Sequence, residues 1–463
     1  MSQITFLGSG GGGPGVFDYI QLHNTNAGAT IGYISFGGTR WISDYGTNNT
    51  FVGGGSGNAT LTVVDATDNV GIGTLALSGL TTGFGNVSVG SGSGVAMTIG
   101  SNNVLIGYEA GISLTVGGNN VAIGRLALAA STDSATNVAV GFESQTSNTT
   151  GDNNAALGYR SLRDLTTGSL NTGIGSNAAE SITTESNNTA VGASSLLNAV
   201  GANNTAIGAN AMMGGAGGVS NNTAVGYNAL NAITSGDDNV VIGASTGTGI
   251  TTGEANVIIG NNIAASNPSQ TVAIGYQAAA FSSGDNNIVI GYAAGLALST
   301  GDNNIIIGTA GDSADDDVIR IGTLGLQDTC FIQGIAGATV TNDDPVLVDT
   351  TTGQLGTISS SARFKDNIAN LSSDLSSKIY DLRPVTFNFK IDKSKKQQVG
   401  LIAEEVQKVL PKFVKLDAKG LPNSVDYHRL PMLMLKEIQK LRNDFKNLYN
   451  EFEAFKKNIH KEI

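Results

Sequence analysis

Short apolar runs recur along the chain between about residues 69 and 308 at a nearly constant spacing. The repeating unit reads approximately N-N-[VT]-A-[IV]-G-x-x-A-L-x-x-[IL]-T-T-G-x. Each run, such as residues 120–124 or 304–308, is rich in β-favouring residues and is bounded by the turn formers Asn, Gly, Thr and Asp. The spacing of the glycine that ends each run is 17 seven times and then varies between 15 and 18, the glycines being Gly73, Gly90, Gly107, Gly124, Gly141, Gly158, Gly175, Gly192, Gly208, Gly226, Gly243, Gly260, Gly275, Gly291 and Gly308.

A unit of this length fits one coil of a β-solenoid. Coils stacked about 4.8 Å apart would give a rod roughly 70 Å long. Alternation places Val121 and Ile123 on one face of a strand and Ala122 on the other, so each coil has a thin apolar lining that only neighbouring coils can bury. The recurring Asn is expected to form a ladder of side-chain amides along the stack.

The last part of the chain has a different period. Apolar residues there alternate in steps of four and three, which predicts the a/d seam of a coiled coil from about residue 431. A helix packed only on its own domain is the alternative, and the sequence does not fix the number of strands. A trimer is expected for consistency with the solenoid. The seam residues are Met434, Ile438, Leu441, Phe445, Leu448, Phe452, Phe455 and Ile459.

These patterns divide the chain into four regions. Residues 1–60 fall outside the repeat and are interpreted as an N-terminal attachment region, and residues 61–310 as the solenoid. Short runs and turn residues predict a β-structured neck over residues 311–359. Residues 360–463 contain lysines, phenylalanines and helical periodicity, and are predicted to form an α+β domain that ends in the coiled coil. The fold class is therefore mainly β.

Charge changes at the same boundary. Residues 1–358 carry five arginines, no lysine and 24 acidic residues, a net charge of −19, whereas residues 359–463 carry a net charge of +7. An acidic shaft repels phosphate backbones, so nucleic acid is an unexpected partner. With 64 glycines and 6% aromatic residues, the 463-residue chain does not resemble an ordinary globular enzyme. No apolar run approaches a membrane span, and the N-terminus lacks the pattern of a secretory signal.

Several motifs are more simply explained by structure than by chemistry. The string Gly71-Ile72-Gly73 lacks the helix that a phosphate loop needs. Asp315 to Asp317 are expected to form a solvated turn and not a cation site. A single cysteine, Cys330, excludes a disulfide within the chain, and no cofactor or metal site is predicted. Acidic residues recur at the turn of the repeat, which argues against a glycan-cleaving pair there: Asp152, Asp237, Asp285 and Asp302.

The core N-x-[VA]-[AI]-[IV]-G of the repeat resembles the head repeat of trimeric autotransporter adhesins. The resemblance covers about residues 69 to 308 and implies a left-handed β-roll in which three chains pack side by side. The usual repeat of that family is shorter than 17 residues, and the secretion signal and membrane anchor of the family are not found here.

The C-terminal region resembles a second family, the endosialidase-type intramolecular chaperones. These are self-cleaving serine peptidases at the ends of phage tail spikes and fibres. Four blocks carry the resemblance in the same order and spacing, namely residues 359–368 (SSSARFKDNI), 380–385 (YDLRPV), 399–406 (VGLIAEEV) and 425–430 (VDYHRL). A homotrimer folded by this segment is implied.

The second resemblance also implies a cleavage site. The family cuts immediately before a serine that lies five residues ahead of a lysine, and these positions are Ser360 and Lys365, so the bond cut is Ser359–Ser360. A serine hydroxyl becomes nucleophilic when a base takes its proton, which a lysine does only when neutral. Where the family often has an acidic residue this chain has Ser361, so the assignment could shift by one. The plain alternative is a serine N-cap, and His428 is expected to be a surface or packing residue.

The function expected from the whole chain is a trimeric fibre or spike of a virus particle. Its N-terminal region would dock onto the particle, and the shaft would attach to a host surface receptor, with a glycan as one candidate. A cell-surface adhesin with the same chaperone is the alternative, and the missing signal favours the virion. No turnover enzyme is expected, only a single-turnover autoproteolytic serine endopeptidase with a Ser–Lys dyad.

Overall fold

A computed structural model of the chain describes residues 21–24, 32–36, 39–61, 65–198, 201–214, 217–264, 266–323, 326–327, 329–330, 332, 346–349, 353–356, 360–417 and 419–462. It divides into two compact units, residues 1–338 and residues 339–463. Each unit is described by itself.

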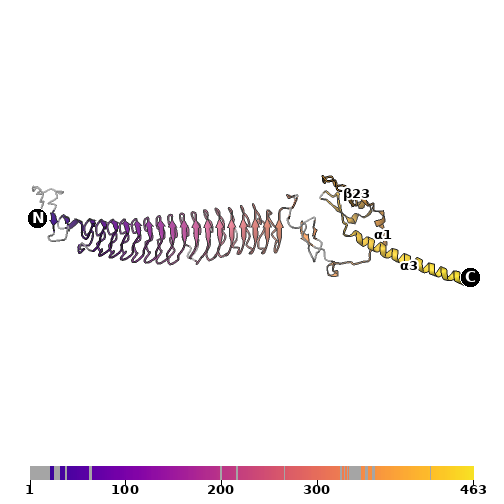
Figure 1. The fold of residues 1–463 in the computed structure, drawn as a ribbon, viewed down its shortest axis with the longest axis horizontal. Helices are drawn as coiled ribbons and strands as arrows, with labels where there is room; N and C mark the ends of the chain where they lie inside the picture. The colour runs from indigo at the N-terminus through magenta and orange to yellow at the C-terminus, as the bar shows by residue number, and fades with distance from the viewer. Residues whose placement is uncertain are drawn as a thin grey trace. The chain divides into compact units, whose positions relative to one another are not determined.

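The first unit is a β-solenoid of about sixteen turns with about seventeen residues in each coil, as the spacing of the glycines predicts. Each coil contributes one short strand that pairs in parallel with the strand of the next coil, so the strands form a continuous ladder (Figure 1). The strands of the ladder are β4 (Thr50–Val52), β5 (Val70–Ile72), β6 (Val87–Val89), β7 (Val104–Ile106), β8 (Val121–Ile123), β9 (Val138–Val140), β10 (Ala155–Leu157), β11 (Thr172–Ile174), β12 (Thr189–Val191), β13 (Thr205–Ile207), β14 (Thr223–Val225), β15 (Val240–Ile242), β16 (Val257–Ile259), β17 (Val272–Ile274), β18 (Ile288–Ile290), β19 (Ile305–Ile307) and β20 (Ile319–Ile321).

The middle residue of each strand from β4 to β19 faces the interior. In β8, Ala122 is fully buried, Val121 is partly buried and Ile123 keeps 36% of its surface exposed. Alternation along the strand predicts two faces, and the structure assigns the small residue to the core and the two β-branched residues to the outside. The rest of the core comes from the turns of each coil, where residues such as Leu128 and Leu162 are fully buried.

The predicted asparagine ladder is present in the interior. The backbone N–H and the side-chain amide of Asn120 both donate to Asn103 Oδ1, at 3.0 and 3.1 Å, and Asn120 Nδ2 also donates to the carbonyl of Ser134 at 2.8 Å. Each rung therefore satisfies buried polar groups of the coil before it and the coil after it. Thr271 takes the place of Asn at one rung. The asparagines are Asn49, Asn69, Asn86, Asn103, Asn120, Asn137, Asn154, Asn171, Asn188, Asn204, Asn222, Asn239, Asn256, Asn287 and Asn304.

The glycine that ends each strand is required by the corner that follows. Gly141 has a φ of +138°, a conformation that L side chains rarely adopt. A Cβ at Gly141 would lie 2.2 Å from the carbonyl oxygen of Gly158 in the next coil. The period read from the sequence is therefore the period of a corner that only glycine fits.

The N-terminal end of the ladder is covered by antiparallel strands. β1 (Gln21–Asn24) pairs with β2 (Gly32–Phe36), β2 with β3 (Thr39–Ser43), and β3 with β4. The parallel ladder thus begins inside residues 1–60, the segment expected to be a separate attachment region. The antiparallel pairing of β3 satisfies the backbone groups that the first coil would otherwise expose.

At the other end, β20 places Arg320 in register with Ile306, at the position where most other coils bury Ala, Val, Ile or Leu. The Arg320 side chain donates to both carboxylate oxygens of Asp315, at 2.5 and 2.6 Å, and Asp315 is 3% exposed. This hydrogen bond from Arg320 lowers the pKa of Asp315. Residues 318–321, expected to belong to the neck, therefore form the last rung of the ladder. Most of the remaining neck lies outside the described residues.

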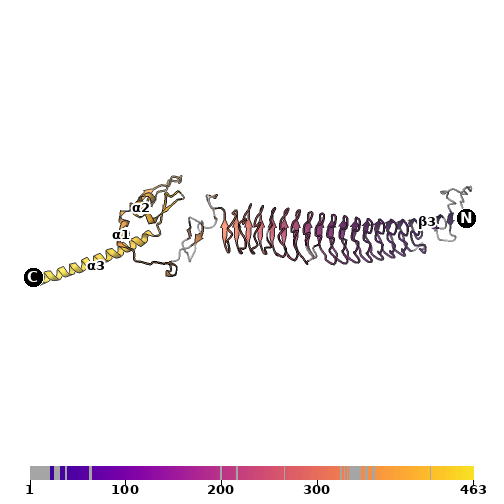
Figure 2. The ribbon, with the colours of Figure 1, turned by 180° about the vertical axis from the view of Figure 1, so that it is seen from behind.

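The second unit is α+β, as expected. It contains η1 (Ala362–Phe364), α1 (Ser373–Ser376), η2 (Ser377–Asp381), α2 (Ala403–Val409), η3 (Pro411–Phe413) and α3 (Leu430–Glu462), with the antiparallel pairs β21 (Leu347–Val348) and β22 (Leu355–Gly356), β23 (Val385–Phe387) and β24 (Gln398–Gly400), and β25 (Val414–Leu416) and β26 (Pro422–Val425). Figure 2 shows α1 and α2 beside the first turns of α3. Its small core is Val406, Leu410, Phe413, Leu430 and Leu433.

The mainly β class, the solenoid and its coil length are confirmed. The left hand of the coil, the trimer and the coiled coil stay predictions at this point.

Candidate functional site

The expected nucleophile and base meet in the segment that precedes α1. Lys365 Nζ donates a hydrogen bond to Ser360 Oγ at 3.1 Å. The short helix η1 lies between the two residues and turns the chain back, which lets a five-residue separation close to hydrogen-bond distance. Ser359, on the other side of the expected cleavage point, lies outside the described residues.

The neighbouring serine has a different task. Ser361 is the N-cap of η1, and its hydroxyl accepts from the backbone N–H of Arg363 at 3.3 Å. The Arg363 side chain also donates to Ser361 Oγ and stacks over the ring of Phe364. Capping therefore involves Ser361, and Ser360 is the serine that Lys365 contacts.

In the single chain this site is open to solvent. Ser360 and Lys365 are both exposed, and the ammonium group donates to the hydroxyl, the reverse of the direction that proton removal requires. Two apolar neighbours of the lysine are also exposed, Phe364 at 69% and Ile368 at 70%. Residues 360–370 thus form an arm, the chaperone arm, which is poorly buried by its own chain.

The other three blocks of the predicted chaperone lie together in the core of the second unit. Arg383 Nε donates to Glu405 Oε2 at 3.1 Å and joins the second block to the third, and this hydrogen bond lowers the pKa of Glu405. Tyr427 Oη accepts from the backbone N–H of Leu401 at 2.8 Å and joins the fourth block to the third. His428 is exposed, as expected.

One buried hydrogen bond between two helices was not predicted from the sequence. Glu437, 5% exposed, accepts a hydrogen bond from the hydroxyl of Ser376, which is fully buried. The pair links α1 to α3 and fixes the first turns of the long helix on the domain. Glu437 lies three residues after Met434 and one before Ile438, so it flanks the seam on the helix surface, where charged residues are common. No signal in the sequence therefore marked this carboxylate as buried.

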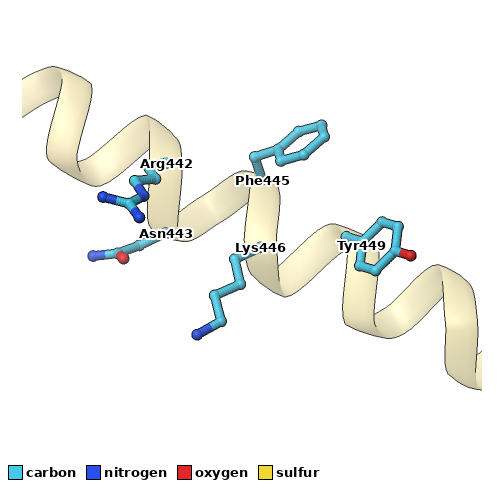
Figure 3. Close-up of a pocket in the computed structure, with 5 residues that line it drawn as sticks. All are labelled: Arg442, Asn443, Phe445, Lys446 and Tyr449. Carbon is cyan, nitrogen blue, oxygen red and sulfur yellow. The ribbon is translucent and has the colours of Figure 1, made fainter.

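The predicted seam forms one continuous helix. α3 spans 33 residues, and all eight seam residues from Met434 to Ile459 remain between 40% and 70% exposed. Figure 3 shows the side chains of Arg442, Asn443, Phe445, Lys446 and Tyr449 projecting from this helix. These five residues line a pocket of about 340 Å³ to which no other described element contributes.

The acidic residues of the repeat have structural partners. The carboxylates of Asp152 and Asp237 accept the backbone N–H groups of Ala135 and Ser220, at 2.7 Å each. Asp285 and Asp302 accept backbone N–H groups of the preceding coil in the same way. These four acids therefore connect adjacent coils.

The described residues contain no group of acidic, histidine or cysteine side chains that could hold a metal ion. Where the structure is described, every helix is too short or too polar to cross a lipid bilayer. Asp316 and Asp317, from the acidic turn, accept hydrogen bonds from Asp302 and Asn303.

Comparison with known proteins identifies the C-terminal region. Residues 360–415 match the family of the chaperone of endosialidase. The match begins at the serine that Lys365 contacts and includes three of the four blocks. No curated protein and no solved structure matches the chain.

Proposed function

We propose that the chain is the precursor of a trimeric fibre or spike protein whose C-terminal region assembles the shaft and then cleaves itself off between Ser359 and Ser360. The observation that supports this most strongly is the coincidence of two positions. The chaperone family match starts at residue 360, and Ser360 is the hydroxyl that Lys365 contacts at 3.1 Å.

The chemistry follows from the two side chains. Neutral Lys365 removes the hydroxyl proton of Ser360, and Oγ attacks the carbonyl carbon of residue 359. The C–N bond to Ser360 breaks, the proton passes from Lys365 to the departing amine, and an ester joins residue 359 to Ser360 Oγ. Water then hydrolyses the ester, which restores the hydroxyl and leaves a carboxylate on the shaft. The site acts once.

In this proposal, assembly supplies the burial of Lys365 that the single chain lacks. Phe364 and Ile368 flank the lysine and are largely exposed. If partner chains cover these side chains, the amine is desolvated, and burial favours the neutral form of a lysine. Cleavage then waits until the chains are assembled.

Two unburied apolar surfaces support self-association. One is the seam of α3. The other lies on the shaft, where the third residue of every strand from β4 to β20 is Val, Ile or Leu although it faces outward, and the first is Val, Ile, Ala or Thr. We call the first and third residues of strands β4 to β20 together the outer row. A continuous column without a charged residue is the kind of exposed surface that marks association sites in soluble proteins. Homotrimer is the proposed state.

The shaft is proposed to be the part that remains, on a virus particle, and to attach to a host surface. Support for this role is the kind of protein that carries this chaperone, a spike or fibre that needs a C-terminal folding aid. The N-terminal region is the proposed point of docking to the particle.

Intact-mass analysis of the purified chain tests the cleavage. The wild type is expected to give two fragments divided between residues 359 and 360, and Ser360→Ala a single intact chain. Ser361→Ala is the matched control and should still be cut, because Ser361 caps η1 and Ser360 supplies the hydroxyl that Lys365 contacts. A single intact wild-type chain would contradict the proposal.

A further inference from the structure

One stretch of the shaft departs from the repeat on its outer surface. The seat after the corner glycine holds small residues in many coils, including Thr74, Ser91, Ser176, Ala193 and Ala209. In four successive coils it instead carries Tyr108, Arg125, Phe142 and Tyr159. The next seat in the same stretch includes Glu109, Glu143 and Arg160.

These side chains form a stacked column. The guanidinium of Arg125 lies 5.9 Å from the ring centroid of Tyr108 and 5.3 Å from that of Phe142. The rings of Phe142 and Tyr159 stack with centroids 5.4 Å apart and planes 8° from parallel. We call Tyr108, Arg125, Phe142, Tyr159, Glu143 and Arg160 the aromatic–arginine column.

The charges of the column are only partly paired within the chain. Glu143 accepts from Arg160 at 2.9 Å, but Arg125 lies 3.9 Å from Glu143, beyond hydrogen-bond distance, and its side chain is 51% exposed. Arg125 therefore lies between two rings, and its exposed guanidinium N–H groups can donate to an acceptor on another molecule. Tyrosine and arginine are the residues that contribute most to protein interfaces.

The interior changes at the same height. In the coil that contains Phe142, Ser144 and Gln145 occupy the positions that Ala127 and Leu128 occupy in the preceding coil. Both Ser144 and Gln145 are fully buried. Asn148 is also buried, donates to Gln145 Oε1 at 3.1 Å and accepts from the N–H of Gly151 at 2.8 Å. The apolar core divides at this coil into one cluster that ends at Ala139 and another that begins at Ala156. The interior of this coil therefore differs from that of its neighbours, within the same stretch that carries the aromatic–arginine column.

The uniform outer row creates a problem that such a departure can solve. The outer row has similar residues in every coil. If one chain slides along another by one coil, about 4.8 Å, each Val or Ile of the row meets another Val or Ile in place of the first. An interface made only of this row has nearly equivalent alignments. Proteins with repetitive interfaces fix the alignment with a polar or charged position that fits in one register only.

We infer that the aromatic–arginine column fixes the axial register of the three chains, with the same column of the neighbouring copy as its partner. A second copy is the fitting occupant, because the column is one corner glycine away from the outer row and carries both signs of charge, so Arg125 of one chain can pair with acids of the next at one height. This inference rests on the trimer of the proposed function.

The test uses a variant built from residues that occur elsewhere in the same seats. Arg125→Ser, Glu143→Asn and Arg160→Asn together bring in the side chains of Ser176, Asn177 and Asn210. Asn also tolerates the positive φ of residues 143 and 160. The matched control is Tyr276→Ser with Tyr292→Ser, a ring pair in the same seat, stacked with centroids 5.5 Å apart, whose next seats are uncharged Gln277 and Ala293.

Register is read by disulfides across the outer row in the full chain with Cys330→Ser. Chains with Ile174→Cys and chains with Val191→Cys, which are one coil apart, are coexpressed, and their cysteine peptides are distinguished by sequence. Mild oxidation and mass spectrometry then give the ratio of 174–191 disulfides to disulfides between like positions. The column variant should raise this ratio severalfold over the parent, and the control should leave it unchanged.

An unchanged ratio in the column variant, with the trimer intact, overturns the register role and leaves the proposed function standing; the exposed column would then be open to an outside ligand. A parent chain that is monomeric in light scattering overturns both. Circular dichroism tests whether each variant folds. If the triple variant does not fold, Arg125→Ser alone replaces it, and this single variant should raise the ratio by a smaller factor.

Discussion

The shaft and the C-terminal unit solve the problem of burial in opposite ways. In the shaft, each coil buries the interior of the next. The asparagine ladder pairs buried polar groups of adjacent coils, and the corner glycines let the coils approach closely, all within one chain. In the C-terminal unit, the arm with Lys365 and the seam of α3 are left uncovered. The coil of the shaft is therefore held by contacts within one chain, whereas under the proposed function the chaperone arm and the seam would be covered only by partner chains.

The largest expected effect separates assembly from folding. Phe445→Asp with Phe452→Asp places charges in the α3 seam of every chain, and an unpaired buried charge costs several kcal/mol per copy. Light scattering should show loss of the trimer. Asn447→Asp with Asn450→Asp adds the same charge outside the seam and should keep the wild-type mass. An assembled seam variant would show that α3 is not the assembling element.

The next effect tests the corner of the coil. Gly141→Ala combines a positive φ with a Cβ 2.2 Å from a backbone oxygen, so we expect a loss of about 3 kcal/mol of stability. Gly308→Ala is the matched control, because Gly308 has a φ of +68° but nothing within 4 Å of the added Cβ. Thermal unfolding followed by circular dichroism measures both, and equal losses would contradict the role of the corner.

A smaller effect is expected within the ladder. Asn154→Ala removes the acceptor of the backbone N–H of Asn171 and one of the two acceptors of its side-chain amide, which costs about 1–3 kcal/mol. Asn154→Thr should cost less, since Thr271 accepts from Asn287 at the equivalent rung. The midpoints of chemical unfolding give the order, and a Thr variant less stable than the Ala variant would contradict it.

The smallest effect concerns the end of the shaft. The folded pKa of Asp315 is lowered by Arg320, so the ion pair stabilises the last coils above the unfolded pKa of about 3.9 and that stabilisation is lost as pH falls below it. Hydrogen exchange in residues 301–321 should therefore accelerate at acid pH relative to coils in the middle of the shaft. Asp315→Asn should remove this extra acid sensitivity, and an unchanged acid response in that variant would assign it to another group.

The sequence predicted the repetitive parts of the fold well, because each seat is sampled many times. A glycine every 17 residues requires a corner, and an Asn at a fixed seat requires a ladder, so both were readable from the pattern. The face of the strand that lies inside was not readable. Alternation places Ala122 on one face of the strand and Val121 and Ile123 on the other, but it does not say which face is buried. Side-chain size does not decide it either, because the buried middle position holds Ala122 in one coil and Leu105 or Ile258 in others.

Features that occur once were harder to predict. Arg320 looks like a surface residue in sequence, and its function as a cover for the last coil depends on Asp315, which only the fold brings near. The contact of Lys365 with Ser360 followed from the family resemblance and not from spacing alone. Ser361 as the cap became visible only with the backbone of η1.

The central claim is that the C-terminal region cleaves itself only after it has assembled the chains. The most direct measurement is the intact mass of the wild type and of the Phe445→Asp, Phe452→Asp variant after the same expression and incubation. The wild type should be divided between Ser359 and Ser360 while the variant stays intact and monomeric. A monomeric variant that is fully cleaved at this bond would contradict the claim.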